Sequence, residues 1–572
     1  MSTVTFPPQP HIDGEQASAS TSTRTFERRL GDSEASYFLP ARADGVNDMY
    51  LRISFTAPPG LLTLERAHTA WAIIRLRNPL LASKVILKTY EDVRFTYDAP
   101  VSPNDALREA ASAFEFRNET KQGVIDRYLN GPRTLSGERV SYLILSSTTP
   151  PDEATKGSRE FGLTLCTVHC LSDGIAMHRT MNQFFSLVGS NKSSDELQHT
   201  LIEEWESRWG KSSRVNVNPL PAAMEDRLNA PAGRLRRAAA LVDFQNTQHK
   251  LIGGHTLPRI NAGARKTITY EASFDEEQTK VIVRKCKANG VSVGHALFAL
   301  CNIAMIRAMG GMSPELPMMI YTALNLRPKL NPAHPSKSSH HFLTIGYHNV
   351  VLPSFLPTTT KTTHAQTQTR TRTKAHSYTG RNANVGATEK TFWLRAQSAK
   401  RQMTEYLKSD MLAARALEMA KERGRRARMW AAEDDGVAAP APASTPSPSS
   451  SLAASAFSPS SFSSAPAPAS PTLLPPAPSV AIIGLSLLGD LDALYDYSAF
   501  PSIHIRGCLC GSRQRKGASL IFAQTLAGRF HMSLGWDSNG LEPDVVNAFW
   551  HGLKSGVHEF VLPGSEMSSA RL

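Results

Sequence analysis

The hydrophobic residues of this chain recur with two spacings, one typical of strands and one typical of helices. Apolar and polar residues alternate along residues 47–57, 139–148 and 161–170, which predicts three strands. Residues 63–83 and 174–188 carry apolar side chains at helical spacing, which predicts two helices with one buried face. The apolar face of the second helix comprises Ile175, Met181, Phe184, Phe185 and Val188. The first part of the chain therefore alternates between strands and helices.

The second part of the chain repeats this alternation. Strands are predicted over residues 266–274, over 315–328, and over 517–537 as a pair around Ala527 and Gly528. Helices are predicted over residues 275–290, 291–310, 391–432 and 542–561, the third as one long helix. Gly290 and Gly310 end two of them, and Pro543 lies in the first turn of the last. Two such series of strands and helices indicate paired α/β lobes.

Composition shifts divide the chain further. A basic, proline-containing stretch at residues 216–265 predicts a crossover between an N-terminal lobe over 26–215 and a C-terminal lobe over 266–572. Low-complexity inserts are expected at about 358–389, rich in Thr, Gln, Arg and His, and at about 436–479, rich in Pro, Ala and Ser. We expect the second insert and residues 1–25 to be disordered, because they offer little apolar surface to offset the entropy of ordering.

Bulk properties of the 572 residues exclude several classes of protein. No apolar run approaches the length of a transmembrane helix, and the first thirty residues lack the apolar core of a secretory signal. We therefore expect a cytoplasmic protein. The terminal Ala570, Arg571 and Leu572 resemble a peroxisomal address, which is the alternative localisation.

The six cysteines form no CxxC pair, and no Cys/His spacing indicates zinc, so no metal site is expected. So few cysteines in a chain of this length indicate free thiols in a reducing compartment. We expect each thiol to act as a small core residue. They are Cys166, Cys170, Cys286, Cys301, Cys508 and Cys510.

The net charge of +13 favours anionic partners. Nucleic-acid binding would require basic residues interleaved with exposed aromatics, or a known module, and the sequence has neither. Part of the charge lies in residues 421–429 and 367–381, which we interpret as a solvated helix face and a solvated loop. We expect no nucleic-acid partner.

The stretch LTLCTVHCLSDGIAMHR, residues 163–179, places His169, Asp173 and Gly174 where a predicted strand ends and a helix begins. A neutral histidine can take a proton from a hydroxyl or amine that attacks an acyl carbonyl. Asp173 could orient the imidazole or fix the loop through an arginine, and Gly174 leaves room for an extended substrate. The alternative is structural: Asp173 caps the helix and His169 is a hydrogen-bonded strand terminus. The motif and its context leave both interpretations open.

The sequence HCLSDG resembles the His-x-x-x-Asp-Gly active-site motif of the CoA-dependent acyltransferase superfamily. This group includes plant BAHD acyltransferases, chloramphenicol acetyltransferase and the condensation domains of non-ribosomal peptide synthetases. The resemblance covers most of residues 25–350 and 480–562, and its nearest subgroup is the fungal secondary-metabolite acetyltransferases of the trichothecene 15-O-acetyltransferase type. Further matching segments, in order, are residues 29–40, 67–83 (with Asn78 in place of the usual His), 291–308, 321–330 and 484–492.

The resemblance implies an α/β fold of two chloramphenicol-acetyltransferase-like lobes, mixed sheets flanked by helices, with the active site at their interface. His169 would be the general base. Asp173 would be structural and paired with Arg327 of NLRP, and Gly174 would line the channel. Acyl-CoA, most simply acetyl-CoA, would be a co-substrate and not a bound cofactor, and the positive charge would steer its phosphates. The partners would be acyl-CoA and a small-molecule acceptor, and we expect a monomer.

Two departures qualify this resemblance. The DFGWG motif of plant BAHD enzymes is absent, which leaves the oxyanion-stabilising group unassigned. Val168 stands where condensation domains have the first His of HHxxxDG, and no carrier-protein or adenylation segment follows. The leading hypothesis is an acyl-CoA-dependent O-acyltransferase that acts on a hydroxylated secondary metabolite such as a terpenoid. The alternatives are an amide-forming, condensation-type enzyme that uses a carrier-protein thioester, and a non-catalytic binding protein on the same fold.

Overall fold

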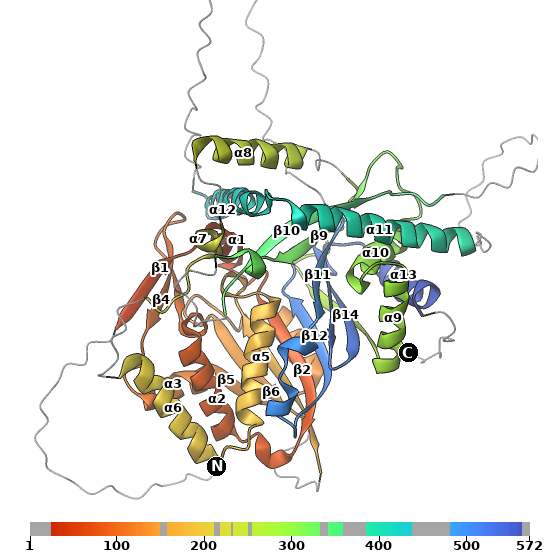
Figure 1. Cartoon of the computed structure of the whole chain (residues 1–572). Helices are drawn as coiled ribbons and strands as arrows, with labels where there is room; N and C mark the ends of the chain where they lie inside the picture. The colour runs from red at the N-terminus through yellow and green to blue at the C-terminus, as the bar shows by residue number, and fades with distance from the viewer. Residues whose placement is uncertain are drawn as a thin grey trace, which may run out of the picture.

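Two mixed sheets, one in each lobe, form the framework of the molecule (Figure 1). The computed structural model describes residues 24–148, 157–210, 218–229, 233–249, 254–331, 341–357, 385–437 and 481–562. Helices flank both sheets, and each lobe has its own large cluster of buried apolar side chains. The predicted two-lobed α/β fold class is therefore confirmed.

The N-terminal lobe is built on a five-stranded sheet with the order β12-β2-β7-β6-β5. Its neighbours are antiparallel except β5 and β6, which are parallel. The strands are β2 (Met49–Ala57), β5 (Phe114–Arg117), β6 (Ser141–Ser146), β7 (Arg159–Thr167) and β12 (His504–Ser512). A smaller antiparallel sheet holds β1 (Thr25–Arg29), β3 (Lys84–Leu87) and β4 (Val93–Asp98). The helices are α1 (Asp32–Ala41), α2 (Leu64–Arg77), α3 (Pro103–Ser112), α4 (Lys121–Asn130), α5 (Gly174–Val188) and α6 (Ser194–Trp209).

The C-terminal lobe is built on a six-stranded sheet with the order β10-β9-β11-β13-β14-β8. Strand β11 runs parallel to both of its neighbours, and the other pairs are antiparallel. The strands are β8 (Thr267–Phe274), β9 (Met318–Asn325), β10 (Ile345–Leu352), β11 (Ile483–Asp490), β13 (Ser519–Leu526) and β14 (Arg529–Asp537). The main helices are α9 (Glu276–Ala288), α10 (Val293–Met309), α11 (Val385–Lys408), α12 (Leu412–Asp434) and α13 (Pro543–Phe560).

One strand of the N-terminal sheet comes from the far end of the chain. The blue strand β12 lies beside the red strand β2 in Figure 1 and pairs with it from Cys508↔Ile53 to Ser512↔Met49. Two three-residue 3₁₀ turns of the same region, η5 (Asp492–Leu494) and η6 (Tyr497–Ala499), contact α5. The C-terminal part of the chain therefore completes the sheet that leads into the His169 motif.

Local sequence signals account for most helix ends. The side chains of Thr63, Asp275 and Ser292 accept hydrogen bonds from backbone N–H groups in the first turns of α2, α9 and α10. Helix α10 ends at Gly310, whose left-handed φ of 64° suits glycine. Pro543 begins α13, where a backbone N–H has no partner within the helix.

The predicted long helix over residues 391–432 is wrong, because the structure divides it into α11 and α12. The break follows Lys408. There the Ser409 hydroxyl accepts a hydrogen bond from Met411 N–H at 3.2 Å, and Leu412 N–H bonds the Ser409 carbonyl. Serine competes in this way with helical backbone bonding. Figure 1 shows the two helices running in different directions.

The predicted crossover contains helices α7 (Met224–Arg227) and α8 (Arg234–His249). Helix α8 packs on α12, where Asp243 forms an ion pair with Arg415 at 2.5 Å (Figure 1). The expected disordered N-terminus and low-complexity inserts lie almost wholly in residues 1–23, 358–384 and 438–480, outside the described residues. The C-terminal tripeptide is also outside them.

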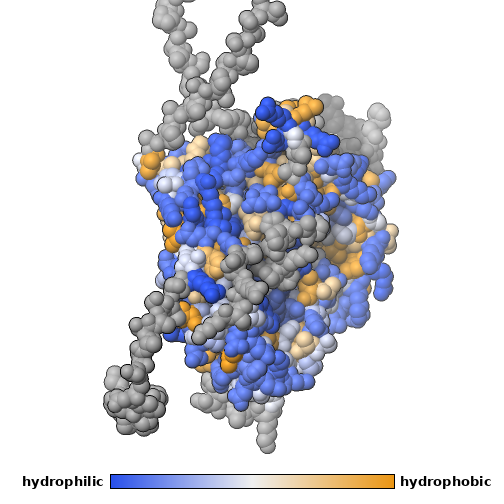
Figure 2. Space-filling model, turned by 60° about the vertical axis from the view of Figure 1, so that its left-hand side comes forward, coloured by the Kyte–Doolittle hydropathy of each residue, from blue (hydrophilic) through white to orange (hydrophobic). Residues whose placement is uncertain are grey.

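The basic segment 421–429 is not simply a solvated face. Arg428 of α12 pairs with Asp32 of α1 at 2.8 Å, and Arg423 lies over two tyrosine rings. In the view of Figure 2, hydrophilic residues cover most of the described surface, with apolar residues in smaller groups between them. Among the described residues no single helix has the length and apolar composition to cross a membrane, and α9 and α10, bent by 90°, meet that test only as a pair.

Candidate active site

His169 begins a short 3₁₀ turn, η3 (His169–Leu171), immediately after β7. Its Nδ1 lies 3.1 Å from the backbone carbonyl oxygen of Ser172. A carbonyl can only accept, so Nδ1–H donates and Nε2 carries the lone pair. The protein backbone therefore selects the tautomer in which Nε2 can act as a base.

The imidazole of His169 packs against Tyr37 of α1. The two rings are stacked, with centroids 3.7 Å apart and planes at 18°. Burial lowers the pKa of His169 from 6.5 to about 4, and it outweighs the opposing effects of backbone hydrogen bonding and of the Asp173 charge. His169 is therefore neutral at physiological pH.

Aromatic and cationic groups surround this histidine. The hydroxyls of Tyr37 and Tyr347 are hydrogen-bonded, and the Arg423 guanidinium lies 5.3 Å and 4.5 Å from their ring centroids. Burial raises the pKa of nearby Tyr321 to about 12, although the charges of Arg423 and Arg515 act in the opposite direction. Tyr321 therefore keeps its proton at physiological pH and can offer an O–H group to the cavity that His169 lines.

Asp173 joins the two lobes. Arg327 Nη1 lies 2.9 Å from both carboxylate oxygens, and Thr344 N–H donates to Oδ2 at 2.8 Å. The same carboxylate caps α5 by accepting from Ala176 N–H at 3.1 Å. Both structural roles considered for Asp173, as helix cap and as partner of Arg327, are thus present together. None of the carboxylate's hydrogen bonds in the described part of the chain goes to His169.

Gly174 is the first residue of α5 and faces the other lobe. A Cβ at this position would lie 2.8 Å from both terminal methyl carbons of Leu488, which is on β11. The lack of a side chain thus lets Leu488 approach the start of α5. Both residues line the same cavity.

That cavity lies between the lobes and has about 1160 Å³ of empty space, part of it open to solvent. Its walls include His169, Gly174 and Tyr50 from the N-terminal lobe, and Arg327, Tyr347 and Leu488 from the C-terminal lobe. Strand β12 also contributes Cys510, Gly511 and Ser512. The four predicted site residues, His169, Asp173, Gly174 and Arg327, all line it.

Sequence reasoning did not identify Tyr37, Tyr347 or Arg423 as part of the site. Tyr37 lies in residues 29–40, a segment that resembles acyltransferase sequences. That resemblance was the one sequence signal that could have pointed to Tyr37. Arg423 belongs to the basic stretch interpreted as solvated, and Tyr347 lies in β10, which carries no motif of its own. Only the folded chain brings the three together.

The two-lobed fold, with a cavity between the lobes, is similar to that of a solved acetyltransferase and a solved condensation domain. No family model matches the sequence, and no curated protein gives a significant match. The solved structures that resemble the chain do so at low sequence identity, so they establish the fold alone.

Among these structures is TRI3, the trichothecene 15-O-acetyltransferase from Fusarium sporotrichioides, with 13% identity and a TM-score of 0.67. The match covers 95% of this chain and 97% of that one. Polyketide synthase associated protein 5 from Mycobacterium tuberculosis matches with 12% identity, a TM-score of 0.50, and 93% and 98% coverage. The condensation domain of the Monacolin K polyketide synthase MokA matches with 11% identity, a TM-score of 0.50, and 94% and 98% coverage.

Proposed function

We propose that this protein is an acyl-CoA-dependent O-acyltransferase that transfers an acyl group, most simply acetyl, to a hydroxyl of a small secondary metabolite such as a terpenoid. The observation that carries the proposal is the geometry of His169. Its Nδ1–H is held by the Ser172 carbonyl, its pKa is about 4, and it lines a cavity between two lobes. The trichothecene acetyltransferase among the structural neighbours supports the choice of acyl acceptor class.

The chemistry follows from the tautomer. Nε2 of His169 takes the proton of the acceptor hydroxyl while the hydroxyl oxygen attacks the thioester carbonyl. When the tetrahedral intermediate collapses, the C–S bond breaks and the imidazolium returns the proton to the CoA thiolate. Tyr37 holds the ring by stacking, and the Asp173–Arg327 pair fixes the loop without sharing the proton.

The acyl donor needs a route with positive charge for its phosphates. A second cavity of about 840 Å³ is lined by three cationic residues, Arg265, Arg515 and Lys516, and by two aspartates, Asp44 and Asp434. The charge of Arg515 also acts on Tyr321 in the wall of the His169 cavity. We assign this side to acyl-CoA. With this assignment, part of the net positive charge would attract the phosphates of acyl-CoA.

The test is release of free CoA thiol from acetyl-CoA in the presence of hydroxylated terpenoids, with mass spectrometry of the product. We expect acceptor-dependent release that is lost in His169→Ala, and unchanged release in Cys286→Ser, a buried residue outside the cavity. No His169-dependent release with any acceptor would contradict the proposal. It would also revive the alternative of a non-catalytic binding protein.

A condensation-type reaction is the second candidate, because condensation domains share the fold. That enzyme would take its acyl group from a phosphopantetheinyl carrier protein and form an amide. The same assay separates the two when it is run with acyl-loaded carrier protein and an amine acceptor. Turnover with the carrier protein but not with acetyl-CoA would replace our proposal with this one.

A further inference from the structure

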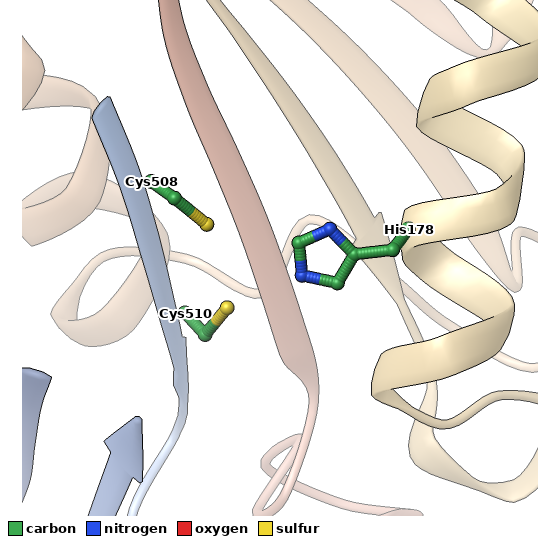
Figure 3. Close-up of side chains that lie close together, drawn as sticks. All are labelled: His178, Cys508 and Cys510. Carbon is green, nitrogen blue, oxygen red and sulfur yellow. The ribbon is translucent and has the colours of Figure 1, made fainter. Parts of the chain in front are cut away.

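Three buried side chains with metal-ligating atoms meet beside the active-site cavity. They are His178 of α5 and Cys508 and Cys510 of β12, and all three are buried. Their nitrogen and sulfur atoms all lie within 4.8 Å of one another. Figure 3 shows both thiol groups and the imidazole directed toward a common space.

The imidazole of His178 is oriented for ligation. Its Nδ1 lies 2.7 Å from the hydroxyl of Tyr495, while Nε2 is fully buried and has no hydrogen-bond partner among the described residues. When Nδ1–H donates to this hydroxyl, Nε2 presents a free lone pair. Metal-bound histidines commonly have such a second hydrogen bond, which fixes the ring and its tautomer.

Gln524 of β13 supplies a second buried atom without a partner. Its Nε2 lies 3.4 Å from Cys508 Sγ and 3.5 Å from Cys510 Sγ, and its Oε1 is buried and unpartnered in the described structure. A half-turn of the amide about its last bond would exchange these two atoms. Oε1 would then face the same space as the sulfur atoms. Leaving a buried acceptor unsatisfied costs about 1–3 kcal/mol, so the free lone pair of His178 Nε2 calls for a ligand, which Oε1 could share after the flip.

We propose that His178, Cys508 and Cys510 form a binding site for one thiophilic metal ion, Zn²⁺, with Gln524 Oε1 as the fourth ligand. Two thiolates and one imidazole are the donors that Zn²⁺ prefers, and its geometry is tetrahedral. Zn–S bonds of about 2.3 Å and Zn–N bonds of about 2.0 Å separate neighbouring ligand atoms by roughly 3.5–3.8 Å. Since the three atoms already lie within 4.8 Å, closing on a metal requires movements of no more than about 1 Å.

The site has a structural consequence that does not depend on the proposed function. Its ligands come from α5, from β12 in the N-terminal sheet and from β13 of the C-terminal sheet. A metal would therefore clamp β12 between the two lobes. His178 and Cys510 also line the His169 cavity, so the clamp would fix one of its walls.

The test is titration of the reduced full-length protein with Co²⁺, which substitutes for Zn²⁺ and absorbs in the visible and near ultraviolet when thiolates bind it. We expect saturation at one equivalent per chain, displacement by Zn²⁺, and a Tm about 5 °C higher with Zn²⁺ than with a chelator. Cys508→Ser and His178→Asn should lose both effects, and the buried Cys286→Ser should keep them.

The titration of the wild-type protein decides the proposal even if a variant fails to fold. The absence of a cobalt–thiolate band at one equivalent would overturn it. So would a band that persists in a folded Cys508→Ser variant. Each readout is independent of acyltransferase activity.

Discussion

The ion pair between Asp173 and Arg327 gives a quantitative prediction about how the lobes are held. Replacing Asp173 by Ala removes a carboxylate that faces Arg327, Thr344 N–H and Ala176 N–H at once. Only 5% of the Asp173 side chain and 10% of the Arg327 side chain is exposed. The guanidinium would therefore be left buried without its counter-charge.

The expected loss is large for a single substitution. Removing one partner of a buried pair costs about 3–5 kcal/mol, because the remaining charge is not solvated. The lost helix cap alone is worth about 1 kcal/mol, so Asp173→Asn, which keeps a capping oxygen, should be less damaging. Asp173→Ala and Arg327→Ala should also be non-additive, with a coupling energy of about 1–3 kcal/mol.

Urea unfolding of the four proteins of this double-mutant cycle, followed by circular dichroism and tryptophan fluorescence, measures the coupling. The control is Glu277→Ala, since Glu277 pairs with Lys280 at 2.7 Å but both side chains are more than half exposed. That substitution should change stability by less than about 0.5 kcal/mol. If Asp173→Ala costs no more than the control, or if the cycle is additive, the pair does not hold the lobes as we describe.

Three further predictions follow from single residues. Burial lowers the pKa of His169 to about 4, and the base must be neutral to act. The value of kcat/KM should therefore stay constant as the pH falls from 7 to about 5 and decrease only near pH 4. A pH profile of kcat/KM that decreases around pH 6.5 would contradict this. Gly174→Ala should displace Leu488 and lower kcat/KM by about tenfold, while stability changes by less than about 1 kcal/mol. The double variant Gly174→Ala/Leu488→Ala should regain activity, and unchanged activity in Gly174→Ala would show that the close approach is unimportant. Ala527 has a left-handed φ of 50°, so Ala527→Gly should raise the free energy of unfolding by about 0.5 kcal/mol, measured as a higher urea midpoint. A lower midpoint would show that no strain is relieved.

The elements themselves could be predicted from the sequence where signals are local. The strands around Ala527 and Gly528 form the predicted hairpin of β13 and β14, and α13 begins at Pro543. Period-two alternation and helix caps act over a few residues, so one sequence is enough to recognise them. The break after Lys408 escaped prediction because a serine hydroxyl competing for one backbone N–H leaves the helical periodicity unchanged.

The candidate site divides in the same way. His169 and Asp173 lie in one short motif, and the structure places Arg327 against Asp173. By contrast, the stacking of Tyr37 on His169 and the approach of Arg423 depend on how α1 and α12 pack. Long-range packing leaves no periodic trace in the chain.

The cysteine pair shows the same limit. Cys508 and Cys510 are two residues apart, and no sequence spacing links them to His178. The link exists only because β12 joins the N-terminal sheet beside α5.

The central claim is that His169 is the general base of an acyl transfer. The most direct measurement compares the single-turnover rate of ester formation from acetyl-CoA and a hydroxylated acceptor in the wild type and in a folded His169→Ala variant. We expect a rate lower by about 10²–10⁴-fold in the variant, with acetyl-CoA binding retained. A folded His169→Ala protein that forms ester at the wild-type rate would contradict it.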